Sequence, residues 1–269
     1  MPELPEVETV VRTLEKQIKG RKITGVDIYW PKVVADGGPE AFASRLLQQH
    51  FRTFSRRGKY LLLGMDDCLL AVHLRMEGKF YVQTKHDPIT RHMHVVFQLD
   101  DGRQLRYHDT RKFGRMEILD LPTDLAHFHL LGPEPFDDSF NAEYIHQWKK
   151  GKRKAVKSLL LDQRFVAGIG NIYADEILAA CKIRPGRSCA RLSRQEEELL
   201  VAKARSILKE AIAMGGTTIR SYTSSLGVSG RFQLHCLVHG QKTCRICKAK
   251  VKVKWIGGRS SYYCPHCQK

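Results

Sequence analysis

The sequence predicts an α+β protein of several domains, and three observations carry this prediction. Between residues 59 and 107, short apolar runs alternate with turn residues, which is typical of antiparallel strands. After residue 139, apolar side chains recur with the three-and-four-residue spacing of helices. The C-terminal residues contain four cysteines in two closely spaced pairs, the pattern of a small metal-bound module.

Length and composition restrict the classes of protein to which the chain can belong. It has 269 residues, of which 42% are hydrophobic and 27% charged, the composition of an ordinary globular protein with about two domains. Collagen, coiled coil and wholesale disorder are excluded. No apolar run approaches the roughly 18 residues of a membrane helix. The start of the chain is acidic and interrupted by proline, unlike a secretory signal, so we expect a cytoplasmic protein.

The charge distribution indicates a polyanionic partner. The formal net charge is +17, and no Asp or Glu follows Glu210 although ten Lys and Arg residues do. Such a surface suits nucleic acid, because each neutralised phosphate releases counterions. A solubilising surface is the alternative, but such surfaces usually mix both signs.

The first element expected is a helix from Pro5 to Gly20, since proline favours the first turn and glycine the position after the last. Its apolar stripe consists of Val7, Val10, Val11, Leu14 and Ile18. Strands should follow over 60–65, 68–76, 79–82, 94–99 and 104–107. A Pro- and Gly-rich linker is expected at 132–138.

Four helical stretches are expected after the linker, three of them with a candidate capping residue. Ser139 could cap a helix that ends at Trp148, and apolar spacing resumes over 155–161. The turn at 166–170 precedes Asn171, which could cap a helix through Cys181. Finally, Ser193 and Glu196 form the sequence pattern of a capping box for a long helix that ends near Gly215.

The four C-terminal cysteines have the spacing Cys244-x2-Cys247-x16-Cys264-x2-Cys267. Each pair can place two thiolates about 2.3 Å from one tetrahedral Zn²⁺, with a β-hairpin between the pairs. A disulfide pair or coincidence is the alternative. Four thiolates close the coordination shell, so one structural zinc ion is predicted. The hairpin would carry the cations Lys250, Lys252, Lys254 and Arg259.

The remaining cysteines, which lack such spacing, are expected to be small hydrophobic residues, with the first two in the core. They are Cys68, Cys181, Cys189 and Cys236.

The chain start offers a nucleophile. Removal of Met1 would leave Pro2 with a free secondary amine, and an α-amine titrates near pH 8, so part of it is unprotonated at neutral pH. Such an amine can attack a sugar C1′ and form an iminium, with Glu3 as a candidate acid or base. Taken alone, however, these two residues could simply start a helix.

Further motifs support the catalytic interpretation. The start, MPELPEVE, closely resembles that of bacterial formamidopyrimidine-DNA glycosylases, and similar motifs follow throughout the chain. They are RRGKY at 56–60, HLRMEG at 73–78, RKFG at 111–114, LGPEP at 131–135, GIGNIY at 168–173 and the four-cysteine module. Endonuclease VIII, a sister family, usually has Gly in place of Leu4, so the oxidised-purine branch is favoured.

The resemblance implies a fold and a division of the chain. It implies an N-terminal catalytic β-sandwich domain with flanking helices over 1–131 and the linker at 132–138. A helical domain with a helix-two-turn-helix motif and a lesion-capping loop would occupy 139–230, and a zinc finger 231–269. DNA would lie between the domains.

The resemblance also implies catalytic roles. Pro2 would attack C1′ and form a Schiff base, while Glu3 would donate a proton that helps to open the sugar. Lys59 matches the proton donor for β-elimination, although an exposed strand-start lysine is the simpler alternative. Arg259 matches the arginine of δ-elimination. Glu6 matches a carboxylate near the site, for which a favourable helix-dipole interaction is an equal explanation.

For DNA contact the resemblance implies His92, Arg111, Lys152 and Asn171. The turn before Asn171 leads into a helix N-terminus, which attracts phosphate on physical grounds as well. The neighbouring His94 could replace His92.

Met76, Arg111 and Phe113 match the intercalating wedge that supports the duplex after nucleotide eversion. A β-domain core is the alternative for Met76 and Phe113. The Gly- and Ser-rich stretch 215–230 resembles the loop that closes over the everted base, although it could be a plain connection. Its lesion-loop candidates are Thr217, Thr218, Arg220 and Tyr222.

The sequence thus predicts a bifunctional DNA glycosylase and AP lyase of base excision repair. It would excise 8-oxoguanine and formamidopyrimidines from damaged double-stranded DNA and nick the strand by β,δ-elimination. It would act as a monomer, associated with the bacterial nucleoid, with zinc as its cofactor. An endonuclease VIII-like enzyme, a catalytically silent DNA-binding module and an RNA-binding zinc protein are the alternatives. His239 stands where relatives commonly have Tyr, which leaves the packing before the finger open.

Overall fold

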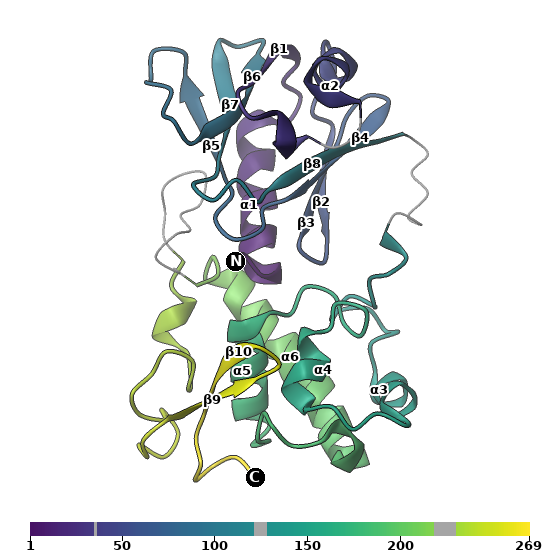
Figure 1. Cartoon of the computed structure of the whole chain (residues 1–269), viewed down its shortest axis with the longest axis vertical. Coiled ribbons are helices and arrows are strands. Elements are labelled where there is room, and N and C mark those ends of the chain that lie inside the picture. Colours follow the sequence, from purple (N-terminus) through teal and green to yellow (C-terminus); the bar gives the residue numbers. More distant parts are fainter. Residues whose placement is uncertain (35–36, 121–127, 218–229) are drawn as a thin grey trace. The chain divides into compact units, whose positions relative to one another are not determined.

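The computed structural model describes residues 1–34, 37–120, 128–217 and 230–269 and divides the chain into two compact units (Figure 1). The first unit comprises 1–127 together with 215–230, and the second comprises 128–214 together with 231–269. The finer division into four segments stays a prediction. No helix among the described residues is long and apolar enough to cross a membrane.

The first unit contains two four-stranded antiparallel sheets, which confirms the predicted β region. One sheet has the order β1 (Ile23–Ile28), β6 (Met93–Leu99), β7 (Arg103–His108) and β5 (Lys79–Thr84). The other has the order β2 (Thr53–Arg57), β3 (Tyr60–Gly64), β4 (Cys68–His73) and β8 (Arg115–Asp120). Strands β1, β2 and β8 were not predicted, because each has fewer buried positions than the central strands and so a weaker sequence pattern.

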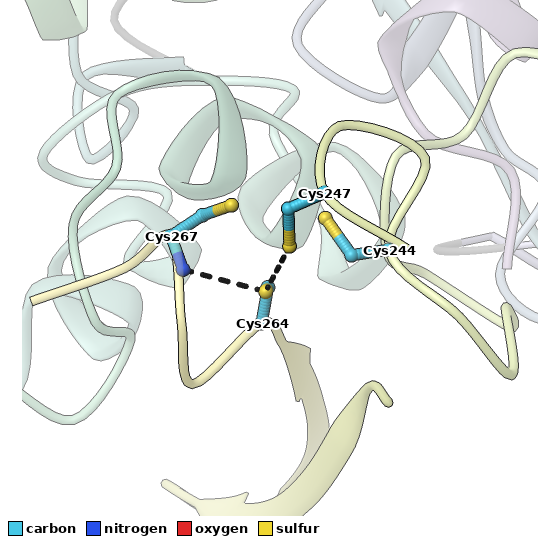
Figure 2. Close-up of side chains that lie close together, drawn as sticks. All are labelled: Cys244, Cys247, Cys264 and Cys267. Carbon is cyan, nitrogen blue, oxygen red and sulfur yellow. Dashed lines mark hydrogen bonds between the residues drawn. The ribbon is translucent and has the colours of Figure 1, made fainter. Parts of the chain in front are cut away.

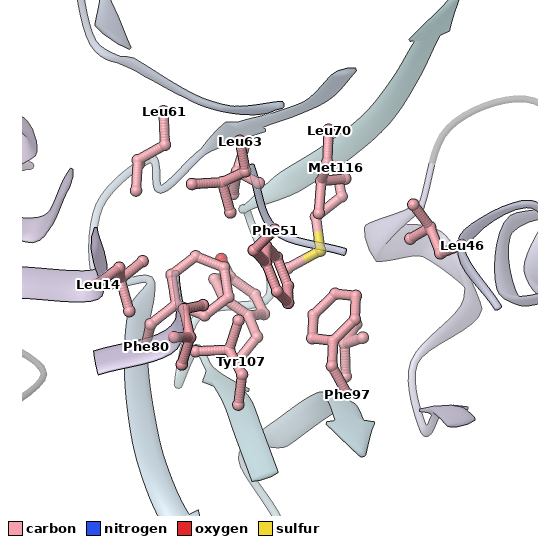
Figure 3. Close-up of a cluster of buried hydrophobic side chains, with 14 of the residues drawn as sticks. Leu14, Leu46, Phe51, Leu61, Leu63, Leu70, Phe80, Phe97, Tyr107 and Met116 are labelled. Carbon is pink, nitrogen blue, oxygen red and sulfur yellow. The ribbon is translucent and has the colours of Figure 1, made fainter. Parts of the chain in front are cut away.

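The core of this unit is formed by side chains from both sheets and from α1 (Leu4–Ile18) (Figure 3). Leu61 and Leu70 come from one sheet, Phe97 and Tyr107 from the other, and Leu14 from the helix. Each fully buried side chain of this kind contributes about 1.5–3 kcal/mol. The implied β-sandwich with a flanking helix is therefore confirmed. Two short elements, η1 (Pro31–Val33) and α2 (Gly38–Leu46), join β1 to β2.

Helix α1 begins one residue before the predicted start and ends as predicted. Glu3 is its N-cap and forms a capping box with Glu6, which satisfies backbone N–H groups of the first turn. Gly20, at φ 77°, follows the C-cap Lys19. Only glycine adopts this left-handed conformation without strain, which explains why the helix stops there.

His73 at the end of β4 is a buried neutral histidine. Burial, with the charges of Arg75 and Lys59, lowers its pKa to about 3, and its Nδ1 accepts the Arg75 N–H at 3.0 Å. Unfolding restores the pKa of His73 to its usual value near 6.5. Below pH 6.5 the unfolded chain therefore binds a proton that the folded protein does not bind.

We therefore predict that this histidine lowers the stability of the first unit by about 1.4 kcal/mol for each pH unit below 6.5, and adds no pH dependence above 6.5. Urea unfolding of the wild type and His73→Gln at pH 7.5, 6.0 and 5.0 measures this effect. The stability difference should shift in favour of the variant as the pH falls. Parallel pH profiles for the two proteins would contradict the prediction.

The second unit is mainly helical. Its helices are α3 (Ala142–Lys149), α4 (Val156–Leu161), α5 (Asn171–Ala180) and α6 (Arg194–Ala213), with the short turns η3 (Cys189–Arg191) and η4 (Phe232–Leu234). Helix α5 packs against α4, α6 and strand β10. The C-terminal hairpin consists of β9 (Lys252–Ile256) and β10 (Arg259–Tyr263).

Two predicted helix caps are wrong. Asn141 caps α3 through its side chain, which accepts the Tyr144 N–H at 2.9 Å, whereas Ser139 lies in the preceding turn closed by Phe140 N and Asp137 O. Gly170 caps α5, and Asn171 is its first helical residue. The capping box of Ser193 and Glu196 is confirmed for α6.

Candidate functional site

The chain start forms a buried polar cluster in the first unit. Pro2 is buried, and only 3% of the Glu3 surface is exposed. The Glu6 carboxylate accepts the Glu3 N–H at 2.9 Å through Oε2, and the Thr217 N–H at 2.8 Å and hydroxyl at 3.1 Å through Oε1. Glu6 therefore joins the first residues of the chain to the segment at 215–217, which is a more specific task than a helix-dipole interaction alone.

This arrangement leaves no space for a side chain at Gly216. A Cβ at this position would lie 2.6 Å from Glu6 Oε1, and the φ angle of Gly216 is +78°. We predict that Gly216→Ala displaces Glu6 and lowers lesion excision by at least about tenfold, since the backbone strain and the clash add. Single-turnover cleavage of a lesion duplex measures this.

Gly215→Ala is the matched control, because φ is +74° but a Cβ would meet only ordinary contacts at 3.8 and 4.0 Å. It should cost no more than the left-handed backbone strain of about 1–2 kcal/mol. Equal activity of the two variants would show that the contact between Gly216 and Glu6 does not matter.

Lys59 lies in the two-residue turn of the β2–β3 hairpin, after Gly58 at φ 56°. Only 6% of its surface is exposed, so the alternative of an exposed strand-start cation is wrong. An ion pair of 2.9 Å between Arg56 and Glu8 fastens β2 to α1. The hairpin that carries Lys59 therefore packs on the helix that begins next to Pro2.

The loop after β7 presents two of the predicted wedge residues. Asp109, which is fully buried, accepts the backbone N–H groups of Arg111, Phe113 and Gly114 at 3.0, 2.9 and 2.8 Å. The Arg111 guanidinium lies 4.8 Å from the centre of the Phe113 ring. Sequence reasoning missed Asp109, although an aspartate before a turn commonly binds the following N–H groups.

Phe113 is 48% exposed, so the core alternative is wrong for this residue, and Met76 is partly exposed. His92 is half-buried and its carbonyl accepts the Asp109 N–H at 2.9 Å. His94 is buried, contacts the Asp109 carbonyl at 2.7 Å, and has a pKa lowered by burial. His94 thus supports the loop from within, and His92 is the more accessible of the two histidines.

The turn that leads into α5 is braced by Gln163, which sequence reasoning also missed. Its side chain accepts the Gly168 N–H at 2.9 Å and donates to the Ile169 carbonyl at 2.8 Å, while Gly168 adopts φ 88°. Asn171 is half-buried, and its Oδ1 has no hydrogen-bond partner among the described residues. The turn therefore offers a helix N-terminus to an anion, to which the Asn171 Oδ1, as an acceptor, does not contribute.

Lys152 lies after α3 with its Nζ 3.7 Å from the centre of the Trp148 ring, and it donates to the Trp148 carbonyl. Lys154 lies over the same ring at 4.7 Å. Trp148 thus gathers two cations, which favours phosphate contact at this point.

The four cysteine sulfurs of the predicted finger all lie within 4.8 Å of one another (Figure 2). The Cys247 and Cys264 sulfurs are 3.4 Å apart, and the Cys267 N–H donates to the Cys264 sulfur at 3.4 Å. A tetrahedral site with bonds of about 2.3 Å needs sulfurs about 3.8 Å apart, so these residues can hold a metal ion. The other four cysteines are buried, as expected.

Arg259 begins β10 directly after the Gly257-Gly258 turn, and its side chain is exposed. The strand that it begins is held by α4 and α5, which a buried ion pair of 2.7 Å between Lys157 and Asp175 joins. Lys157 also donates to the Ser260 carbonyl at 2.8 Å, and Asp175 accepts the Tyr262 N–H at 3.1 Å. The helix that starts at Asn171 therefore also positions the hairpin of Arg259.

His239 joins the same network. Its Nδ1 lies 2.8 Å from Asp175 Oδ2, and its ring packs against Tyr262 at 4.7 Å between centres. The adjacent Glu176 accepts the backbone N–H groups of Val238 and His239 at 3.0 and 2.7 Å. His239, whose packing the sequence left open, thus has defined partners, and the two helix carboxylates fix the segment that leads into the finger.

Thr218, Arg220 and Tyr222 lie outside the described residues. Of the predicted lesion-loop residues, only Thr217 is described, and it contacts Glu6.

Two family models match the chain. The model of the formamidopyrimidine-DNA glycosylase N-terminal domain matches residues 1–116, and that of the formamidopyrimidine-DNA glycosylase H2TH domain matches residues 131–223. The chain belongs to the formamidopyrimidine-DNA glycosylase family. The predicted family, enzyme class and fold are therefore confirmed.

Similar proteins agree over the full length. The formamidopyrimidine-DNA glycosylases of Bacillus licheniformis and Bacillus subtilis are 43% and 41% identical to the chain. Both alignments span the whole chain, and they span 100% and 99% of the two relatives. Among solved structures, a complex of Lactococcus lactis Fpg with DNA that contains an abasic site has a TM-score of 0.94 at 38% identity, with 99% of each chain covered. A complex of wild-type Lactococcus lactis Fpg with DNA that contains an oxidised pyrimidine has a TM-score of 0.93 at 37% identity, with both chains fully covered.

Proposed function

We propose that the protein is a bifunctional glycosylase and AP lyase that excises 8-oxoguanine and formamidopyrimidines from duplex DNA through Pro2. The observation that carries this proposal is the placement of Pro2 and Glu3 at a buried helix start, where the Glu6 carboxylate accepts the Glu3 N–H. Family membership supports the chemistry, and the basic surface supports the DNA partner.

The reaction begins after removal of Met1, which frees the Pro2 amine. The amine lone pair attacks C1′, and the base leaves with the electrons of the glycosidic bond after protonation. The nitrogen gives its remaining proton to Glu3, and Glu3 donates a proton to the ring oxygen O4′. As the C1′–O4′ bond breaks and the sugar ring opens, the freed nitrogen lone pair forms an iminium with C1′. Water then removes a C2′ proton, the electrons of that bond form a C2′=C3′ double bond, and the 3′ phosphate leaves with the electrons of the C3′–O bond. Lys59 acts as the proton donor to the leaving group. Arg259 assists the second elimination, which expels the 5′ phosphate, and water releases the sugar fragment from Pro2.

DNA contact is proposed for His92, Arg111, Lys152 and Asn171, as the family resemblance implies. The exposed Phe113 with Arg111 over its ring, together with Met76, would fill the space left by the everted nucleotide. The buried Asp109 supports this role, because its carboxylate accepts the Phe113 N–H and so holds the loop in place. Thr217, Thr218, Arg220 and Tyr222 are proposed to contact the everted base.

We propose zinc as the ion held by Cys244, Cys247, Cys264 and Cys267. Four thiolates with this spacing favour Zn²⁺, which would fold the hairpin and hold Arg259 without taking part in the reaction. The enzyme would act as a monomer on DNA in the bacterial cytoplasm.

Borohydride trapping on a duplex with one 8-oxoguanine opposite cytosine tests the mechanism. Protein shown by mass spectrometry to begin at Pro2 should give a covalent band, and Pro2→Gly and Glu3→Gln should lose or greatly weaken it. Glu15→Gln, which removes a carboxylate that pairs with Lys19 on the same helix, is the matched control and should trap normally. No band from the processed wild type would refute excision through Pro2 and favour a silent DNA-binding module.

Comparison of single-turnover rates on 8-oxoguanine and on oxidised pyrimidines tests the lesion class. The oxidised purine should be processed faster. A faster rate on pyrimidines would favour the endonuclease VIII-like alternative.

A further inference from the structure

The second unit contains a hollow of about 540 Å³ that lies apart from the predicted site residues. Three segments line it: the chain from Arg184 to Arg187 with Arg191, the C-terminal hairpin, and Lys269 at the end of the chain. Cavities of this size commonly take ligands as large as a nucleotide. All lining residues belong to one compact unit and to the described part of the chain.

The charge of the hollow points to an anionic ligand. Five cationic side chains line it: Arg184, Arg187, Arg191, Lys254 and Lys269. The Arg184 guanidinium is held in place by the Gln268 and Pro265 carbonyls at 2.9 and 3.2 Å. Within the described residues, only Arg187 of the five has a carboxylate partner, Glu196 at 2.5 Å.

Arg187 also retains a hydrogen-bond donor for a ligand. Its Nε is buried and has no acceptor among the described residues, although its terminal nitrogen pairs with Glu196. A buried guanidinium N–H without an acceptor is costly, and a phosphate oxygen would satisfy it.

The hairpin side of the hollow lies on the face that carries Arg259. Lys254 and Ile256 alternate with outward residues along β9, and Ile256 is directly opposite Arg259 in the register of the hairpin. Directly opposite residues of an antiparallel pair point to the same face of the sheet. Apolar and aromatic walls are supplied by Pro185, Ile256 and Tyr263.

We propose that this basic hollow is a second phosphate site, which binds phosphates of a DNA strand beyond those beside the lesion. Phosphates would pair with Arg191, Lys254 and the Arg187 Nε, while sugar carbons would contact Ile256 and Tyr263. The inference rests on the proposed DNA-binding function and extends the strand path along the hairpin face of Arg259. A free nucleotide or polyphosphate carries the same phosphate groups as a DNA strand. The experiments below distinguish these two kinds of ligand.

The test compares two duplexes with a central abasic-site analogue, one of about one helical turn and one of about three turns. Fluorescence anisotropy at several salt concentrations gives affinity and salt dependence for the wild type, for Arg191→Gln with Lys254→Gln, and for Lys209→Gln with Lys203→Gln. The last variant removes two cations from α6 and is the matched control. Melting temperatures check that all three proteins fold.

The hollow variant should bind the long duplex about tenfold more weakly, and its salt slope should fall by about two, one for each lost phosphate contact. Its binding of the short duplex and the binding by the control variant should be unchanged. Unchanged binding of the long duplex, or an equal loss on both duplexes, would overturn the proposal. Wild-type protein that binds neither duplex would instead refute the proposed function.

Calorimetry with inorganic tripolyphosphate, without DNA, distinguishes the free anion from the strand. Weak binding that the hollow variant loses, together with its weaker binding of the long duplex, supports the strand phosphate site. If the variant loses tripolyphosphate binding while its affinity for the long duplex stays unchanged, the hollow serves a free anion and the assignment to DNA is overturned.

Discussion

Replacement of Cys247 by alanine is expected to abolish metal binding and δ-elimination together. The segment around the four cysteines has a small core, formed by Val238, Val251 and Ala179 with the cysteines themselves, and cannot fold on apolar burial alone. Structural zinc supplies about 10 kcal/mol or more in such modules, so the hairpin should unfold without it. Zinc content by atomic absorption and δ-elimination product on an abasic duplex measure the two losses.

Cys247→His is the matched control, because three cysteines and one histidine also form a structural zinc site. This variant should retain zinc and most of the δ-elimination activity. Chelation of the wild type should reproduce the loss, and zinc should restore it. A metal-free Cys247→Ala protein with full δ-elimination activity would show that the finger does not hold Arg259 in place.

Replacement of Asp175 by alanine is expected to lower the free energy of unfolding of the second unit by about 3–5 kcal/mol. The carboxylate and the Lys157 ammonium are both fully buried, so the change leaves a charge without its counterion. It also releases the Tyr262 N–H and His239 from their common acceptor. Urea unfolding, followed by a signal from the second unit, measures the loss.

The double variant Lys157→Met with Asp175→Leu separates charge burial from strand placement. Because both charges are removed, it should be more stable than Asp175→Ala. Its β10 still lacks the contacts at Ser260 and Tyr262, so the ratio of δ- to β-elimination product should remain low. A normal product ratio in the double variant would show that the ion pair stabilises the unit without positioning Arg259.

The candidate site was predictable where chemistry depends on residues close in sequence. The cysteine spacing predicted the finger, and the motif around Lys59 singled out a lysine that the structure places in a hairpin turn. The residues that position the site were not predictable, because their partners are distant in sequence. Asp109, Lys157, Asp175 and Glu176 were not singled out by the sequence analysis, and their partners are known only from the fold.

Local rules also explain why two of the three predicted helix caps are wrong. A capping box needs only residues three apart, and Ser193 with Glu196 was correctly predicted. Ser139 and Asn171 are good capping residues, but a preceding turn in one case and Gly170 in the other moved the helix starts. Which of several suitable residues caps a helix depends on the path of the chain before it.

The sequence by itself determined the family through its motifs, and it determined the antiparallel β region, the paired cysteines and the basic character of the chain through periodicity, spacing and charge. Tertiary structure decided which groups the acidic residues hold: Glu6, which the resemblance placed near the site, accepts from Thr217, Asp109 accepts from the wedge loop, and Asp175 pairs with Lys157 beneath the finger. The physical reason is that a buried carboxylate is tolerated only when the fold supplies donors from several segments, and no single segment contains them.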